Sequence, residues 1–270
     1  MRFPDARRVH VVLVTCLTLM LGASPARAAD AGRVIDAGGQ RQWISCTGSG
    51  APTVVISSGL RADHTMWRKV IGPIAGRTRV CITDRPGLGS SPARRGARTV
   101  DAGIHAEELR AVLDAAGEQG PFLLVGHSYA GLIVRAFAAA HPDEVAGILL
   151  LDAVWPGIHR EMGSGYASPW REGGTAVDIA ASSRAARGGP DLGAIPLIVI
   201  GAGDPARTAS SRGRLWNRRQ ADAAQLSSAG KLWFAKDSGH VIQVDSPRIV
   251  LRAIDRLLAQ ARDARSSVSG

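Results

Sequence analysis

The chain has 270 residues, of which 45% are hydrophobic and 21% charged, a composition that fits one large globular domain and excludes a disordered or collagen-like chain. Its 33 basic and 23 acidic residues give a formal net charge of +10, but no run of five or more basic residues and no aromatic ladder among the arginines accompany that charge. The excess charge is therefore no basis for a nucleic-acid partner, and none is expected.

The first residues have the features of an export signal. Three arginines within the first eight residues precede an apolar run from Val11 to Ala23. This run is too short to span a bilayer, which needs about 20 residues, and the segment 26–28 has the small-x-small pattern of a cleavage site. We therefore predict that residues 1–28 are a signal peptide. The domain over 29–270 is then secreted or periplasmic, without a stable membrane anchor.

Strands and helices alternate in the first part of the remaining chain. Two short segments, Arg33–Asp36 and Gln42–Cys46, flank a Gly-Gly pair and predict a β-hairpin. A β-branched run over 52–57 predicts a buried strand. A helix over 66–75 and a strand over 79–83 are expected to follow.

The alternation continues to the end of the chain. In chain order we expect a helix over 100–116, a strand over 122–125, a helix over 129–140, strands over 146–151, 197–200 and 232–235, and a helix over 249–261. Between 153 and 195 the periodicity is lost. The pattern predicts an α/β fold with a mostly parallel eight-stranded sheet and helices on both faces.

One turn between a predicted strand and a predicted helix carries a candidate nucleophile. The segment PFLLVGHSYAG places Ser128 after an apolar strand and before an Ala-rich helix. A serine on such a turn adopts a strained conformation that exposes its hydroxyl, and the turn needs very small residues on either side. Gly126 and Ala130 meet this need, although Ala130 adds one methyl to the usual second glycine. The alternative is a serine that only caps the helix.

A serine nucleophile needs a base and an acid that orients the base. His240, in KDSGHVIQVDSP between the last predicted strand and the last helix, is the candidate base. Two aspartates end apolar strands and are candidates for the acid. They are Asp204 in GAGDP and Asp152 in GILLLD, and position alone does not choose between them.

Five segments together resemble the α/β-hydrolase superfamily, and in particular its secreted bacterial esterase- and lipase-like members. They are GHSYAG, DRPGLGSS, HPDEVAGILLLD, GAGDP and SGHVIQVDSP. The resemblance extends from Arg33 to the final helix and implies an α/β-hydrolase fold with a short lid after the sixth strand, at 153–195. The Gly201-x-x-Asp204 spacing resembles the family's acid loop, which favours Asp204 over Asp152 as the triad acid.

The resemblance also implies roles for residues around the triad. The family's oxyanion hole uses the backbone N–H that follows the nucleophile, here Tyr129, and a second N–H that corresponds to Leu60. Leu60 follows Ser-Gly, where family members often have His-Gly. In the lid region, Trp155, Tyr166 and Trp170 either line the substrate pocket or anchor the lid to the core.

In the family's sheet, the strands that contain Cys46 and Cys81 are antiparallel neighbours. Facing residues on such strands lie within the distance range of a disulfide. Because the chain is expected to be exported, we predict a Cys46–Cys81 disulfide rather than two buried thiols.

These residues predict a serine hydrolase that cleaves an ester-type bond of a small-molecule substrate through an acyl-enzyme. An acyltransferase, a carbon–carbon bond hydrolase and a peptidase use the same triad and are alternatives, as is a non-catalytic binding protein on this scaffold. Epoxide hydrolases and haloalkane dehalogenases of this fold need an aspartate in place of Ser128. No cofactor and no metal site is expected, and the sequence leaves the oligomeric state open.

Overall fold

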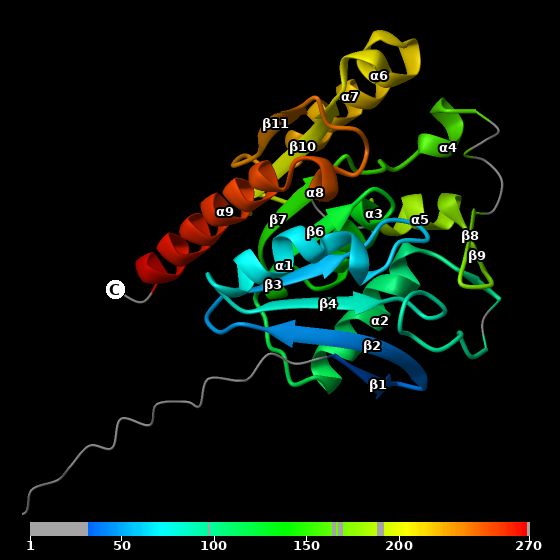
Figure 1. Cartoon of the computed structure of the whole chain (residues 1–270), viewed down its shortest axis with the longest axis vertical. Coiled ribbons are helices and arrows are strands. Elements are labelled where there is room, and N and C mark those ends of the chain that lie inside the picture. Colours follow the sequence, from blue (N-terminus) through cyan, green and yellow to red (C-terminus); the bar gives the residue numbers. More distant parts are fainter. Residues whose placement is uncertain (1–31, 97, 164–165, 167–169, 188–191, 269–270) are drawn as a thin grey trace, which may run out of the picture.

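The computed structural model describes residues 32–96, 98–163, 166, 170–187 and 192–268. The predicted signal peptide lies outside these residues. The main sheet has eight strands in the order β1-β2-β4-β3-β6-β7-β10-β11 (Figure 1). Strand β2 pairs antiparallel with β1 and with β4, and the remaining pairs are parallel. The predicted mostly parallel α/β sheet is confirmed.

The strands of this sheet lie where the hydrophobic pattern predicts them. Their bounds are β1 (Arg33–Ala37), β2 (Gln40–Thr47), β3 (Thr53–Ser57), β4 (Val80–Asp84), β6 (Phe122–His127), β7 (Val145–Leu151), β10 (Leu197–Gly203) and β11 (Lys231–Lys236). Every residue of β3, β4 and β6 is buried, because helices cover both faces of the central strands. In β2, nearer the edge, buried and more exposed residues alternate.

Helices cover both faces of the sheet. One face carries α1 (Arg68–Ala75), α8 (Ile242–Asp245) and α9 (Pro247–Val268), and the other carries α2 (Ala102–Ala115), α3 (Ala130–Ala140), α5 (Ile179–Ala185) and α7 (Ser211–Ala224) (Figure 1). Successive strand residues divide between the two cores, so Leu124 packs toward α2 and α3 while Leu123 and Val125 pack toward α1 and α9. Among the helices of the described residues, none is both long and apolar enough to cross a membrane.

The region predicted as a lid contains several short elements. They are α4 (Ile158–Glu161), the hairpin strands β8 (Trp170–Glu172) and β9 (Thr175–Val177), and α5. Strand β9 also pairs with β5 (Thr99–Val100), so the hairpin forms a small second sheet. Elements of three to seven residues are too short to show a hydrophobic period, which is why the sequence pattern is lost here.

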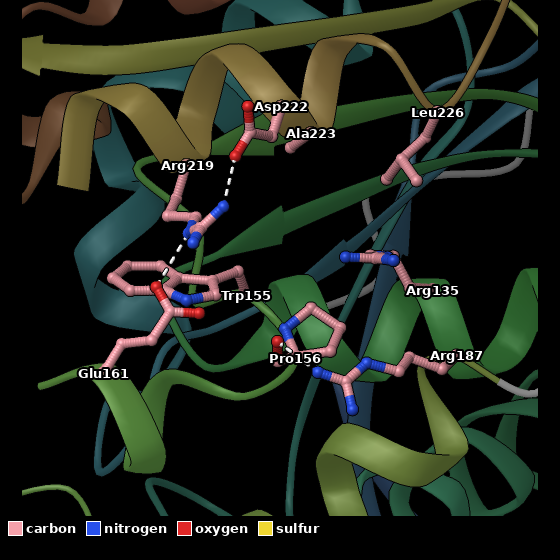
Figure 2. Close-up of a pocket in the computed structure, with 9 residues that line it drawn as sticks. All are labelled: Arg135, Trp155, Pro156, Glu161, Arg187, Arg219, Asp222, Ala223 and Leu226. Atoms are coloured by element: carbon pink, nitrogen blue, oxygen red, sulfur yellow. Dashed lines mark hydrogen bonds and ion pairs between the residues drawn. The ribbon is translucent and has the colours of Figure 1, made fainter. Parts of the chain in front are cut away.

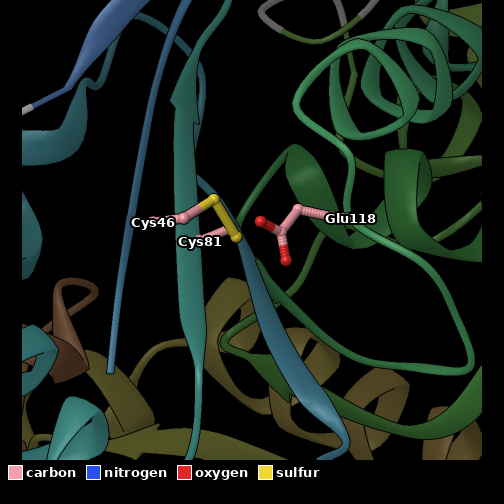
Figure 3. A group of neighbouring side chains, drawn as sticks. All are labelled: Cys46, Cys81 and Glu118. Carbon is pink, nitrogen blue, oxygen red and sulfur yellow. A yellow bond between two sulfur atoms is a disulfide. The ribbon is translucent and has the colours of Figure 1, made fainter. Parts of the chain in front are cut away.

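The two cysteines face each other across β2 and β4 and form a disulfide. Cys46 pairs with Cys81 in the strand register, and their sulfur atoms are 2.08 Å apart. Figure 3 shows Glu118 beside this bond, but its carboxylate accepts hydrogen bonds from Arg79 at 2.6 and 2.8 Å. Disulfide sulfurs are not the thiolate ligands that metal ions bind, so this group is not a metal site. The predicted disulfide is confirmed.

Candidate active site

Ser128 occupies a tight turn between β6 and α3. Its φ is +54°, a conformation that costs a non-glycine residue on the order of 1–3 kcal/mol. Hydrogen bonds from the Ser128 N–H to the Leu151 carbonyl (3.0 Å) and from the Val154 N–H to the Ser128 carbonyl (2.9 Å) hold the turn. A Cβ on Gly126 would lie 2.7 Å from the Ala130 carbonyl oxygen, so a larger residue does not fit. The strained turn expected from the sequence is present.

His240 lies between this serine and a buried carboxylate. Its Nε2 is 2.9 Å from the Ser128 Oγ, and its Nδ1 is 2.6 Å from the Asp152 Oδ2. The Asp152 side chain is fully buried, whereas that of His240 is 40% exposed. The serine, imidazole and carboxylate therefore form one continuous hydrogen-bonded chain, buried at the carboxylate and partly exposed at the imidazole.

The structure corrects the predicted acid: Asp152, and not Asp204, contacts the imidazole. The Asp204 carboxylate accepts a hydrogen bond from the Ala206 N–H at 2.9 Å and caps the short helix α6 (Pro205–Ala209). Asp152 directly follows the more central strand β7, and its Oδ1 accepts hydrogen bonds from the Ala202 N–H (3.1 Å) and the Trp216 Nε1 (2.9 Å). Both aspartates end a strand, and the Gly201-x-x-Asp204 spacing, which favoured Asp204, selected the wrong one.

Asp152 is held as a carboxylate by the groups around it. Besides the histidine, Arg207 donates from Nη1 to the Oδ2 at 2.6 Å. Burial by itself raises the pKa of Asp152, but the hydrogen bond from His240 and the Arg207 charge outweigh burial and lower that pKa. Asp152 is thus ionised at neutral pH and can accept the Nδ1 proton of His240, which leaves Nε2 free to accept the Ser128 proton.

A second histidine supports the position of the first. The Nε2–H of His127 donates to the backbone carbonyl of His240 at 2.8 Å. Burial, and then the proximity of His240, lower the pKa of His127 to about 4. His127 is therefore neutral at pH 7 and fixes the loop of His240 without adding a charge beside it.

The loop after β3 lies against the serine turn. A Cβ on Gly59 would be 3.2 Å from the Ser128 Cβ. The next residue is Leu60, and Tyr129 is the residue immediately before α3, where backbone N–H groups have no helical acceptor. Within the described residues, no acceptor binds the N–H of Leu60 or Tyr129. The two predicted oxyanion-hole donors are therefore on segments that meet at Ser128.

A buried ion pair fixes the carbonyls of this loop. The Arg85 guanidinium donates to the Ser58 and Gly59 carbonyls, each at 2.7 Å, and to both oxygens of Glu172 at 2.7 and 2.8 Å. Glu172 also accepts the Arg61 N–H at 3.2 Å. Burial opposes ionisation of Glu172, but the Arg85 charge and hydrogen bonds outweigh it and lower the pKa of Glu172 to about 2. This pair ties the β8–β9 hairpin to the loop after β3.

The sequence profile of the α/β hydrolase fold family matches residues 52–186 of the chain. The chain belongs to the α/β-hydrolase fold family. It is 28% identical over 214 residues to the uncharacterized protein YqjL of Bacillus subtilis (strain 168), an alignment that covers 77% of this chain and 83% of YqjL. It is 35% identical over 104 residues to the lipase LipV of Mycobacterium tuberculosis, which is 38% of each chain.

Solved structures agree with this assignment. The fold is similar to that of a thermophilic esterase from Thermogutta terrifontis, with a TM-score of 0.62 and 19% identity over 85% of this chain and 98% of the esterase. At this identity the likeness shows the fold alone. The family and the fold expected from the sequence are thus confirmed.

In this α/β-hydrolase, His240 lines a cavity of 260 Å³ beside α7. The other lining residues are Met162, Tyr166, Arg207, Ser210, Arg212, Gly213 and Trp216. Of the three aromatic residues singled out in the lid region, Tyr166 lies in this cavity, and Trp170 packs against Tyr166 and Tyr129 at ring-centroid distances of 5.6 and 6.1 Å. Trp155 is buried against the edge of Trp216 and does not line it.

Sequence reasoning missed several residues that contact the site. Arg207 and Trp216 bind Asp152, and Glu172 binds Arg85, but each comes from a segment without a recognisable motif. Only His127, which is adjacent to Ser128, had a signal in the sequence.

Proposed function

We propose that this α/β-hydrolase is a serine hydrolase of carboxylic esters and acts on small molecules through an acyl-enzyme. The observation that carries the proposal is the chain of two short contacts, Ser128 Oγ to His240 Nε2 and His240 Nδ1 to Asp152 Oδ2, at a serine held in a strained turn. Asp152 thereby replaces Asp204 as the proposed acid. The lipase among the relatives supports the same class of reaction.

The proposed reaction has two halves. As the Ser128 Oγ attacks the ester carbonyl carbon, His240 accepts the serine proton at Nε2, and the Leu60 and Tyr129 N–H groups stabilise the negative oxygen that forms. The tetrahedral intermediate expels the alcohol, which takes the proton from His240. Water then attacks the acyl-enzyme, His240 accepts and returns a proton in the same way, and the acid leaves.

The serine at the turn favours this chemistry over related chemistry on the same fold. Epoxide hydrolases and haloalkane dehalogenases of this fold form their covalent intermediate on an aspartate, and this chain has Ser128 at that position. A binding protein that had lost catalysis would have no reason to keep an ionised, fully buried Asp152 against His240.

The test is ester hydrolysis by the purified protein that lacks residues 1–28. We expect turnover of members of a series of p-nitrophenyl esters from acetate to decanoate, and loss of nearly all turnover in Ser128→Ala with the circular-dichroism spectrum unchanged. Absence of turnover across this series and across a matching thioester series, or equal turnover by Ser128→Ala, would contradict the proposal.

Export is the second part of the proposal. The predicted signal peptide and the Cys46–Cys81 disulfide both favour an oxidising compartment outside the cytoplasm. Expression of the full chain in a bacterial host should give a secreted or periplasmic protein whose intact mass begins at residue 29. A mass that retains Met1, or an acylated cysteine, would contradict this.

A further inference from the structure

A second hollow, of 290 Å³, has a lining of its own, which Figure 2 shows. Its lining residues are Arg135, Trp155, Pro156, Glu161, Arg187, Arg219, Asp222, Ala223 and Leu226. None of them lines the cavity of His240, and the two hollows use different residues of α7. The proposed reaction gives this hollow no role.

The carboxylates of the hollow are already occupied. Arg219 donates to Glu161 at 2.8 Å and to Asp222 at 2.6 Å, and Figure 2 shows its guanidinium between the two. These three side chains together carry one negative charge, and Arg219 is the partner of both acids. Neither of these carboxylates is therefore bound by the other cations that line the hollow.

Those remaining cations are Arg135, from α3, and Arg187, which follows α5. Within the described residues Arg135 has no hydrogen bond or ion pair, and Arg187 donates only to the Pro156 carbonyl at 2.7 Å. Burial, and then the Arg187 charge, lower the pKa of Arg135 to about 10. Arg135 is still protonated at neutral pH, so its partly buried charge is repelled by that of Arg187, which is exposed at the rim of the same hollow.

A third guanidinium, that of Arg160, lies near Arg187 but does not line the hollow. A Cβ built on Gly157 would lie 2.7 Å from the Nη2 of Arg187 and 3.0 Å from the Nη2 of Arg160, so the two nitrogens flank a single point. Gly157 has a φ of +97°, and the space beside its α-carbon is where these cations converge.

An uncharged donor in the same wall is also unused. Trp155 is 5% exposed, and its buried Nε1 has no acceptor among the described residues. An indole N–H donates only, and a buried donor without an acceptor costs about 1–3 kcal/mol. Arg135 and Arg187, which have no carboxylate partner among the described residues, and the Trp155 indole N–H thus line one hollow with donors that lack an anionic acceptor.

We propose that this hollow binds the phosphate or carboxylate group of a small-molecule ligand between Arg135 and Arg187. Arginine suits this role because its planar fork donates two parallel hydrogen bonds to such an oxyanion. Trp155, Pro156 and Leu226 line the rest of the space and contact a small organic part of the ligand. Bound anion removes the repulsion between the two guanidinium groups, which is the source of the affinity.

The experiment measures binding of inorganic phosphate, and separately of acetate, to the protein without residues 1–28. Titration calorimetry and thermal unfolding are run at constant ionic strength, with chloride as the balancing anion. For the wild type we expect saturable binding and a melting temperature that rises with phosphate, acetate or both. The stronger of the two probes identifies the ligand group as phosphate or carboxylate.

Two double variants with the same change of charge provide the comparison. Arg135→Gln with Arg187→Gln is expected to raise the dissociation constant at least tenfold. Arg248→Gln with Arg256→Gln, which removes two exposed arginines of α9, is expected to leave it within twofold of the wild type. A wild type that binds neither probe, or equal binding by both double variants, would overturn the proposal.

A single variant separates an anion site from a structural role. Because Arg135 has no partner for its charge, it contributes repulsion in the absence of ligand. The Arg135→Gln variant should therefore have a melting temperature in chloride equal to or above that of the wild type. Its melting temperature should also rise less than that of the wild type when the anion that binds is added. A lower melting temperature of the variant in chloride, together with a rise on adding the anion as large as that of the wild type, would also overturn the proposal.

Discussion

Replacement of Asp152 by asparagine, side by side with the same change at Asp204, tests the geometry of the proposed triad. The two substitutions remove the same charge from two strand ends of one sheet. Only Asp152 accepts the Nδ1 proton of His240, at 2.6 Å, whereas Asp204 caps α6. The account therefore predicts opposite results for two chemically identical changes.

The expected magnitude follows from what each carboxylate binds. An asparagine at 152 either turns its amide N–H toward the Nδ1 of His240 or offers Nδ1 its carbonyl oxygen, a weaker acceptor than a carboxylate. In both cases the imidazole is no longer held in the tautomer that leaves Nε2 free to accept the serine proton. Such a change lowers kcat by about 10⁴, or about 5 kcal/mol of transition-state stabilisation. At 204, asparagine is as good an N-cap as aspartate, so kcat should stay within about twofold and the free energy of unfolding within a few tenths of a kcal/mol.

Stability gives a second readout for Asp152. Its carboxylate accepts hydrogen bonds from Trp216, Ala202 and Arg207 in addition to the histidine. An asparagine satisfies fewer of these donors, which should lower the free energy of unfolding by about 1–3 kcal/mol.

The assay is steady-state hydrolysis of the best p-nitrophenyl ester, with urea unfolding of each variant as the control for folding. A folded Asp204→Asn that loses turnover while Asp152→Asn keeps it would refute the assignment of the acid and the reasoning from the structure.

Three further predictions concern the frame around the triad. Oxidised protein should present neither Cys46 nor Cys81 to an alkylating reagent after denaturation, and reduction should lower the free energy of unfolding by up to about 4 kcal/mol, since the bond joins residues 35 apart; two alkylated thiols without reduction would contradict this. The pKa of Glu172 is about 2 in the folded protein and its ordinary value is 4.5, so its contribution to stability is full above about pH 5 and is lost as pH falls toward 2. Between pH 6 and pH 3, the free energy of unfolding measured in urea should therefore fall more steeply with pH for the wild type than for Glu172→Gln. An equal fall for the two proteins would contradict the role given to Glu172. Gly59→Ala would place a Cβ 2.8 Å from the buried Nδ1 of His127 and should lower kcat by about 10². The control Gly76→Ala, whose Cβ would have its nearest neighbour at 3.6 Å, should leave kcat unchanged. Equal kcat values for the two variants would contradict the packing of the loop after β3.

The fold was predictable because its signals are local and repeated. Buried parallel strands such as β3 and β6 are short apolar runs bounded by small residues, and these runs are visible without a structure. Ser128 was also predictable, since the turn requires small residues at fixed offsets in the chain. The Cys46–Cys81 pair followed from the order of strands that the family resemblance implied.

Helix α7 escaped sequence reasoning for a physical reason. Its buried face consists of Gly213, Trp216, Gln220 and Ala224, so helical spacing is present but the residues are not the large aliphatic ones that mark an amphipathic helix. Gln220 is buried because its amide exchanges hydrogen bonds with the backbone of residue 153.

The acid was misassigned because the decision depends on distances between strands. Asp152 and Asp204 follow neighbouring parallel strands, β7 and β10, and both end at the same edge of the sheet. Which carboxylate meets the imidazole depends on how far each chain continues before it turns. Asp152 turns at once, with φ at +41°, whereas Asp204 continues into α6.

The most direct test of the central claim is to locate the nucleophile with a fluorophosphonate that labels activated serines. Intact mass and peptide mapping of the labelled wild type should show one adduct per chain, on Ser128. Ser128→Ala should take up no label, and His240→Ala should react at least 10³-fold more slowly. An adduct on another residue, or an undiminished rate in His240→Ala, would contradict the account.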